Sequence, residues 1–132
     1  MVHTNNRKNI WIIAGSRHFN DVKYMFSELN RYADMYGYPE TVVSGTARGA
    51  DTCGELWADK HGIAVKKFPA DWNAHGKKAG PIRNNMMAEY AKDNGMLFLF
   101  WDGQSAGSRS MLHAAQIRNI PVVQFVLDKE AM

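Results

Sequence analysis

Cysteine, long apolar runs and a leader-like start are all scarce or missing in this sequence, and each absence excludes a class of protein. The 132 residues contain a single cysteine, so no internal disulfide can form and a disulfide-stapled secreted scaffold is excluded. The longest apolar stretch, Met96 to Trp101, is far too short to span a membrane. The polar residues 1–9 predict no signal peptide. We therefore expect a cytoplasmic protein with no membrane partner.

An excess of charge of one sign is also missing. Sixteen Lys and Arg residues against 13 Asp and Glu residues give a net charge of +3, and the basic residues are scattered along the chain. Proteins that bind nucleic acid through its phosphates usually gather Lys and Arg on one element. We therefore do not expect a nucleic-acid partner, and DNA binding as an accessory protein is only a third hypothesis. Five histidines and one cysteine without paired spacing predict no metal site, and we expect no cofactor.

Short apolar segments alternate with segments of helical periodicity along the chain. The predicted strands are 9–14, 41–43, 63–68, 96–101 and 121–127. The predicted helices are 22–36, 50–61, one that opens at Gly80-Pro81 and stops at Gly95, and one capped by Ser108 that runs to Arg118. We expect Leu56 to face inward from the second of these helices, and a glycine- and lysine-rich loop between Pro69 and the third. This alternation predicts an α/β fold, a Rossmann-like three-layer sandwich with a parallel sheet of about five strands in the order 3-2-1-4-5. We expect one domain over 9–127, a flexible segment over 1–8 and a tail over 128–132.

Glycines, hydroxyls and arginines follow the predicted strands. In an open parallel sheet, ligands bind beyond the carboxyl ends of the strands, where these residues would gather. Glycine lets backbone N–H groups approach an anion, and arginine offers a planar fork suited to phosphate. We expect at least one of Trp72 and Trp101 to stack on a base. The predicted ligand-binding set is Gly15, Ser16, Arg17, Ser44, Gly45, Arg48, Gly49, Asp51, Trp72, Lys77, Arg83, Asn84, Trp101, Ser105, Gly107 and Ser108.

The known phosphate-binding motifs do not account for this set. The segment GTARGAD lacks the spacing of the P-loop, and no GxGxxG follows the first strand, so P-loop and dehydrogenase classes are disfavoured. Each loop taken alone also has a plain structural interpretation, since glycine is common wherever a strand joins a helix. Asp51 in a first helical turn is equally consistent with a residue that complements the helix dipole. The combination predicts a composite pocket for a nucleotide-derived ligand.

Four segments carry a resemblance to a known family: GSRHF, VVSGTARGAD, FPADWNAHGKKAGPIRNNMMAEYA and FWDGQSAGSRSML. Together they resemble the DUF2493 (YspA-like) family of the SLOG superfamily, over about residues 9–126. This resemblance implies a Rossmann-like fold and a pocket for nucleotides or nucleotide-derived ligands. It also implies relatives that hydrolyse the N-glycosidic bond of nucleoside monophosphates. Those relatives carry the motif PGGxGTxxE after the strand that corresponds to 96–101 here. Here Gly107-Ser108 stands at the phosphate-binding Gly-Thr, and Met111 replaces the glutamate.

Two main hypotheses follow from the residues and the resemblance. As a binding module, the protein senses or sequesters a nucleotide-derived ligand at the carboxyl edge of the sheet. As an enzyme, it is an N-glycosidase or phosphoribohydrolase, which needs a carboxylate to activate water or to hold the ribose hydroxyls. The candidate catalytic residues for that alternative are Asp71 and Asp102. The apolar helix faces and the resemblance also predict a homo-oligomer.

Overall fold

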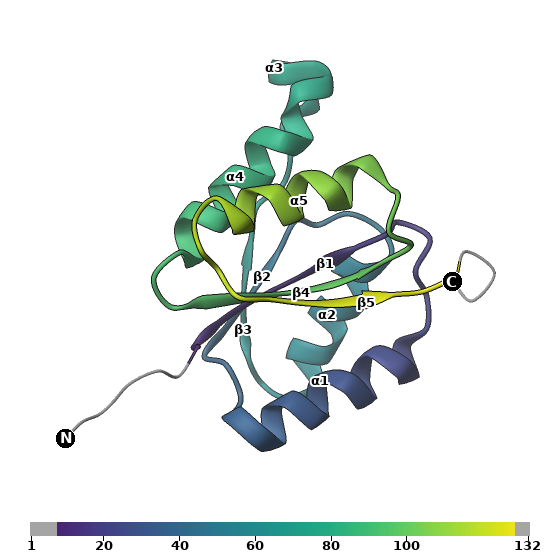
Figure 1. Ribbon diagram of the computed structural model, residues 1–132, viewed down its shortest axis with the longest axis vertical. Coiled ribbons are helices and arrows are strands. Elements are labelled where there is room, and N and C mark those ends of the chain that lie inside the picture. The colour runs from purple at the N-terminus through teal and green to yellow at the C-terminus, as the bar shows by residue number, and fades with distance from the viewer. Residues whose placement is uncertain (1–7, 129–132) are drawn as a thin grey trace.

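The computed structural model describes residues 8–128, and within them the predicted alternation of strands and helices is present (Figure 1). The elements are β1 (Ile10–Gly15), α1 (Val22–Tyr36), β2 (Thr41–Ser44), α2 (Ala50–Lys60), β3 (Ala64–Lys67), α3 (Trp72–His75), the 3₁₀ turn η1 (Gly76–Lys78), α4 (Ala79–Ala91), β4 (Gly95–Trp101), α5 (Ala106–Gln116) and β5 (Val122–Val126). No helix in this part of the chain is long and apolar enough to cross a membrane. The predicted flexible segment 1–8 and tail 128–132 lie outside the described residues, apart from residues 8 and 128.

The strands form one parallel sheet in the order β3-β2-β1-β4-β5, which confirms the predicted topology and the Rossmann-like class. β1 lies at the centre, with Ile12 opposite Val43 of β2 and opposite Leu97 of β4. Because the order reverses at β1, the carboxyl ends of β1 and β4 flank the switch point where open sheets bind ligands.

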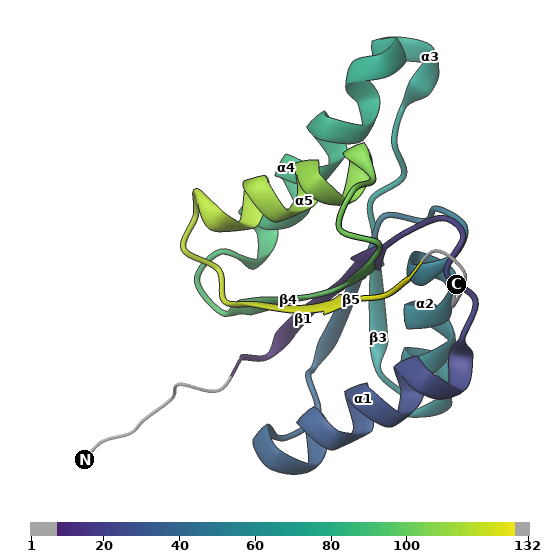
Figure 2. The ribbon, with the colours of Figure 1, turned by 45° about the vertical axis from the view of Figure 1, so that its right-hand side comes forward.

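Helices cover both faces of the sheet, so alternate residues of the central strands enter two separate cores (Figure 2). Trp11 and Ile13 of β1 pack with Leu29 and the other buried residues of α1 and α2. Ile12 faces the other way and packs with Met87 and the other buried residues of α4 and α5. Packing on both faces therefore fixes the sheet, including the carboxyl ends of its strands.

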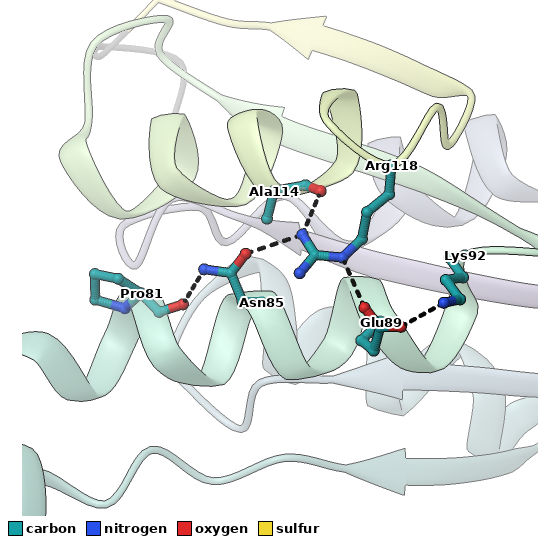
Figure 3. A network of polar contacts seen from close by, with 6 residues as sticks. All are labelled: Pro81, Asn85, Glu89, Lys92, Ala114 and Arg118. Atoms are coloured by element: carbon teal, nitrogen blue, oxygen red, sulfur yellow. Dashed lines mark hydrogen bonds and ion pairs between the residues drawn. The ribbon is translucent and has the colours of Figure 1, made fainter.

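The two helices on the upper face in Figure 1 are joined by Arg118, which lies just after α5. Its Nη1 donates to the carbonyl of Ala114 at 3.0 Å and to Oδ1 of Asn85 at 2.9 Å (Figure 3). Its Nε lies 3.3 Å from Oε1 of Glu89, whose other oxygen pairs with Lys92 at 2.6 Å. These contacts hold the distal part of α5 against α4.

Three local expectations are wrong. Residues 72–78 are expected to form a glycine- and lysine-rich loop, but they form α3 and η1 and lead directly into α4. The α3 end of this segment projects beyond the sheet in both views (Figures 1 and 2). The last helix begins at Ala106 with Ser105 at its N-cap, so Ser108 lies in the first turn and does not cap it. Leu56, expected to face inward from α2, is 49% exposed.

Candidate functional site

A cleft of about 500 Å³ opens at the carboxyl ends of β1 and β4. Its walls come from the loops after β1, β2 and β4, from the first turns of α2 and α5, and from the middle of α4. Ten of its lining residues belong to the predicted ligand-binding or catalytic sets: Gly15, Ser16, Arg17, Asp51, Arg83, Asn84, Asp102, Ser105, Gly107 and Ser108. The structure thus brings together residues that are more than 90 positions apart in the sequence.

The loops after β1 and β2 meet through their backbones. The carbonyl of Ser16 accepts a hydrogen bond from the amide of Ala50 at 3.1 Å. Gly49, the residue before Ala50, has a φ of +79°. A Cβ on Gly49 would lie 2.2 Å from the carbonyl oxygen of Ser16. Only glycine fits this position, and the close approach aims the N-terminus of α2 at the cleft.

Asp51 is the most buried acidic group in the cleft. It lies in the first turn of α2, is 6% exposed, and its Oδ2 accepts from the amide of Ala47 at 3.1 Å. Burial raises the pKa of Asp51 to about 6, and Glu55 adds to this rise, while the Ala47 hydrogen bond and the charges of Arg83 and Arg17 oppose it. A carboxyl group that ionises near neutral pH inside a cleft is typical of a functional site.

Arg83 of α4 reaches across the cleft to the loop after β2. Its Nη1 donates to the carbonyl of Gly45 and its Nε to Oδ1 of Asn84 at 2.9 Å. A Cβ on Gly45 would lie 2.7 Å from Nη1 of Arg83 and 2.8 Å from Oδ2 of Asp51. Glycine at position 45 therefore leaves room for both charged side chains. Burial lowers the pKa of the Arg83 guanidinium, Asp51 opposes this shift, and nearby Arg17 adds to it.

Asn84 connects α4 to the N-terminus of α5. Its Nδ2 donates to the carbonyl of Gly107 at 3.3 Å and to Oγ of Ser110 at 3.1 Å. Because Asn84 is only 5% exposed, these bonds are shielded from water. This amide fixes where the first turn of α5 stands relative to Arg83.

The N-terminus of α5 has two hydroxyl groups without partners. The Oγ atoms of Ser105 and Ser108 are buried and make no hydrogen bond within the part of the chain that the structure describes. Ser108 is 4% exposed, and both residues line the cleft. The first turn of a helix also presents backbone N–H groups that have no intrahelical acceptor, at the positive end of the helix dipole. Donors gathered at a helix N-terminus in this way are typical of anion-binding sites in proteins.

A second cleft of about 440 Å³ lies next to the first and shares Arg17, Ala47 and Arg83 with it. Trp72, at the start of α3, forms part of its wall and is 50% exposed. The Arg17 guanidinium carbon lies 5.9 Å from the centre of the Trp72 ring. Of the remaining predicted residues, Gly45 and Arg48 line this cleft only.

Five predicted residues line neither cleft. The prediction that Trp101 binds the ligand is wrong, because Trp101 is a core residue. It is only 3% exposed and packs under α5, and its Nε1 donates to Oε1 of Gln124 at 3.1 Å. Asp71 is an exposed helix cap whose Oδ1 accepts from the Ala74 amide at 3.1 Å. The other three, Ser44, Gly49 and Lys77, also lie away from both cleft walls.

Ser44 has an identifiable local role, whereas Lys77 is a surface residue. Ser44 donates to Oε2 of Glu55 at 2.5 Å and accepts from the Thr46 amide at 3.0 Å, so it shapes the loop after β2. Lys77 is exposed within η1. Asp102, the second proposed catalytic residue, does line the first cleft, where its Oδ1 accepts from the amides of Gln104 and Ser105 at 2.8 and 2.9 Å.

Some lining residues were missing from the predicted set. Ala14, Ala47, Met87 and Met111 supply apolar wall, and Gln104 and His18 supply further polar groups. The apolar residues give no chemical signal in the sequence, because they resemble core residues at helix and strand spacing. Residues 8–128 contain no group of three His, Cys, Asp or Glu side chains that could hold a metal ion.

The fold and the cleft define a Rossmann-like α/β protein with a polar cleft at the carboxyl edge of its sheet. The chain belongs to the YspA, cpYpsA-related SLOG family, whose model matches residues 10–75. It is also 34% identical over 119 residues to the "Gene 61 protein" of Mycobacterium phage D29, which covers 86% of this chain and 94% of that protein. Membership in this family points to nucleotide-related binding or processing.

A solved structure shares the fold. DNA processing protein A (DprA) from Streptococcus pneumoniae superposes with a TM-score of 0.63 at 15% identity, over 88% of this chain. The chain spans about half of that protein, 49% of its length. At this identity the likeness concerns the fold alone.

Proposed function

We propose that the protein binds a nucleotide or a nucleotide-derived phosphorylated ligand, with a phosphate at the N-terminus of α5. The observation that carries this proposal is the pair of buried, unpartnered hydroxyls of Ser105 and Ser108 at the first turn of an 11-residue helix. Burying a hydroxyl without a partner costs roughly 1 to 3 kcal/mol. A phosphate oxygen that accepts from these groups removes that cost.

The arginines supply the charge that such a ligand needs. Arg17 and Arg83 line the same cleft, and Arg83 is already positioned by its bonds to Gly45 and Asn84. A guanidinium that is held before binding loses little side-chain entropy when it pairs with phosphate. Asp51, with its Oδ2 held by the Ala47 amide, is placed to accept from a ribose hydroxyl.

Cleavage of an N-glycosidic bond is the alternative function, and the buried Asp51 favours it. Water activation or ribose binding in such a reaction requires a carboxylate beside the sugar. Of the two proposed catalytic residues, Asp102 lines the cleft and Asp71 does not. Asp51 adds a second carboxylate whose raised pKa suits proton transfer near neutral pH. The pair Asp51 and Asp102 is therefore the catalytic proposal under this alternative.

A thermal-shift screen tests the binding proposal. The ligands are AMP, ADP-ribose, NAD, cyclic nucleotides and deoxynucleotides, each added in large excess. A ligand at roughly 100 times its Kd adds about 2.7 kcal/mol of stability, which moves Tm by several degrees in a domain of this size. We expect at least one ligand to raise Tm, and a screen in which none does would contradict the proposal.

Two variants and a product assay complete this test. Ser108→Ala should lose most of the ligand-induced rise, while Ser27→Ala, an exposed hydroxyl on α1, should keep it. Release of free base and ribose 5-phosphate from a bound nucleotide would establish the enzyme, and an unchanged ligand would establish a binding protein.

Self-association is proposed on separate grounds. Ile82, Met86 and Tyr90 follow one another at four-residue spacing along α4, and all three are exposed. Sedimentation velocity of the protein should therefore give a mass above that of one chain. Gel-shift assays with DNA test the third hypothesis, for which we expect no salt-dependent shift.

A further inference from the structure

The second cleft adds a separate compartment to the proposed nucleotide site. We propose that the ligand crosses from the first cleft into the second past Arg17 and Arg83, and that its far aromatic ring stacks on Trp72. The class of ligand this implies is a dinucleotide whose two nucleosides are joined through phosphates. This inference rests on the proposed function, because the phosphate site at α5 anchors one end of the same ligand.

The two arginines stand where the clefts join. Arg17 and Arg83 line both compartments, whereas Ser108 and Asp51 line only the first, and Arg48 lines only the second. A linear ligand that fills both clefts therefore passes its middle section beside these two guanidinium groups. Phosphates are the part of a nucleotide that guanidinium groups bind best, so the linker of the ligand carries the phosphates.

The chemistry of the second cleft differs from that of the first. Its described lining contains three arginines, one tryptophan and no carboxylate, while the first cleft contains Asp51 and Asp102. A compartment with an aromatic ring and cationic groups suits a base next to phosphate, since bases stack on tryptophan and guanidinium planes. Each cleft also falls within the range of volumes that small-molecule sites occupy, about 300 to 1,000 Å³.

Trp72 is held in place and yet open to solvent. It begins α3 directly after the Asp71 cap, and its ring edge lies against Gly80 of α4, where a Cβ would come within 3.4 Å of Cη2. Half of its side chain remains exposed, whereas Trp11, Trp57 and Trp101 are at most 3% exposed. Trp72 is thus a fixed stacking surface, and it alone of the four tryptophans can meet a ligand.

Calorimetry with two matched sets of ligands tests this inference. The first set is the four nucleoside 5′-monophosphates, and the second is the four symmetric dinucleoside diphosphates that are made from them. A stacked base contributes roughly a 5- to 150-fold gain in affinity. We expect the best dinucleotide to bind with a Kd lower than that of its mononucleotide by about this factor, and to reduce quenching of the tryptophan fluorescence by acrylamide.

Variants locate the gain in the second cleft. Trp72→Ala should abolish the advantage of the dinucleotide over its mononucleotide, and Trp72→Phe should keep most of the advantage. Tyr36→Ala is the matched control, because Tyr36 is an exposed aromatic residue (62%) that lines neither cleft, and it should change neither Kd.

The outcomes separate this inference from the proposed function. If mononucleotides bind and Ser108→Ala weakens them, but dinucleotides bind no more tightly, the dinucleotide inference is overturned and the proposed function stands. The dinucleotide inference is likewise overturned if Trp72→Ala retains the full advantage. If no member of either set binds the wild-type protein, this inference is overturned, and the proposed function is overturned as well when the wider thermal-shift screen also gives no hit.

Discussion

Replacing Asp51 by Asn tests whether burial in the cleft disfavours the ionised form of this carboxyl group. The side chain is 6% exposed, and its Oδ2 is held by the Ala47 amide, a bond that the carbonyl of an asparagine can also accept. Burial raises the pKa of Asp51 from 3.8 to about 6 in the folded protein. Because the folded pKa lies above the unfolded one, ionisation of this group destabilises the fold at neutral pH.

The size of the effect follows from that shift. A rise from 3.8 to about 6 corresponds to about 3 kcal/mol at 1.36 kcal/mol per pKa unit. The destabilisation by ionised Asp51 is complete above the folded pKa of about 6. It decreases as the pH falls from 6 towards 3.8, because over this range Asp51 is protonated in the folded protein and still ionised in the unfolded chain. Asp51→Asn should therefore stabilise the protein by up to about 3 kcal/mol near pH 8, and by almost nothing near pH 4.

Urea unfolding of the two proteins across this pH range measures the effect. The difference in the free energy of unfolding between variant and wild type should grow from about pH 4 to about pH 7 and then level off, while all other titrating groups cancel. Asp34→Asn, an exposed residue on α1, removes the same charge and serves as the control. Parallel pH profiles for wild type and Asp51→Asn would refute the assignment of a raised pKa to this carboxyl.

Three further predictions concern the walls of the site. Gly49→Ala should destabilise the protein by more than about 2 kcal/mol in urea unfolding, because a Cβ would lie 2.2 Å from the Ser16 carbonyl at positive φ; a loss below about 1 kcal/mol would contradict the close approach. Arg118→Met should cost about 1 to 3 kcal/mol by the same assay, since it removes the contacts that join α5 to α4, and unchanged stability would show that these contacts contribute nothing. Arg83→Ala should abolish the ligand-induced rise in Tm and leave the far-ultraviolet circular dichroism unchanged; a wild-type rise would remove the guanidinium from the site.

The order of the sheet could be predicted because the evidence for it is local and repeated. Each buried strand is a short apolar run closed by a turn residue, and right-handed crossovers leave few orders for five parallel strands. The segment 72–78 was not predicted as helical, because it has no apolar periodicity to mark a buried face. Its one signal of a helix is Asp71, a residue type that caps helices and also serves in catalysis.

The candidate site was predicted in its location more accurately than in its individual residues. Trp72 and Trp101 both follow apolar runs and precede polar loops, so the sequence alone does not distinguish them. The structure does, because Trp101 is the last residue of the seven-residue β4 and lies under α5, while Trp72 begins a helix that projects from the sheet. The burial of Asp51 has no signal in the sequence, because Gly45 and Arg83 come close to it only in the fold.

Binding of phosphate at the N-terminus of α5 is the central claim, and a titration of the ¹⁵N-labelled protein followed by NMR tests it most directly. The four nucleoside 5′-monophosphates are compared with the four nucleosides, which differ from them only in the phosphate. We predict that a monophosphate shifts the amide signals of Gly107 and Ser108 strongly and that its nucleoside leaves them in place. Signals of these two amides that stay unchanged at saturating concentrations of all four monophosphates would contradict the account.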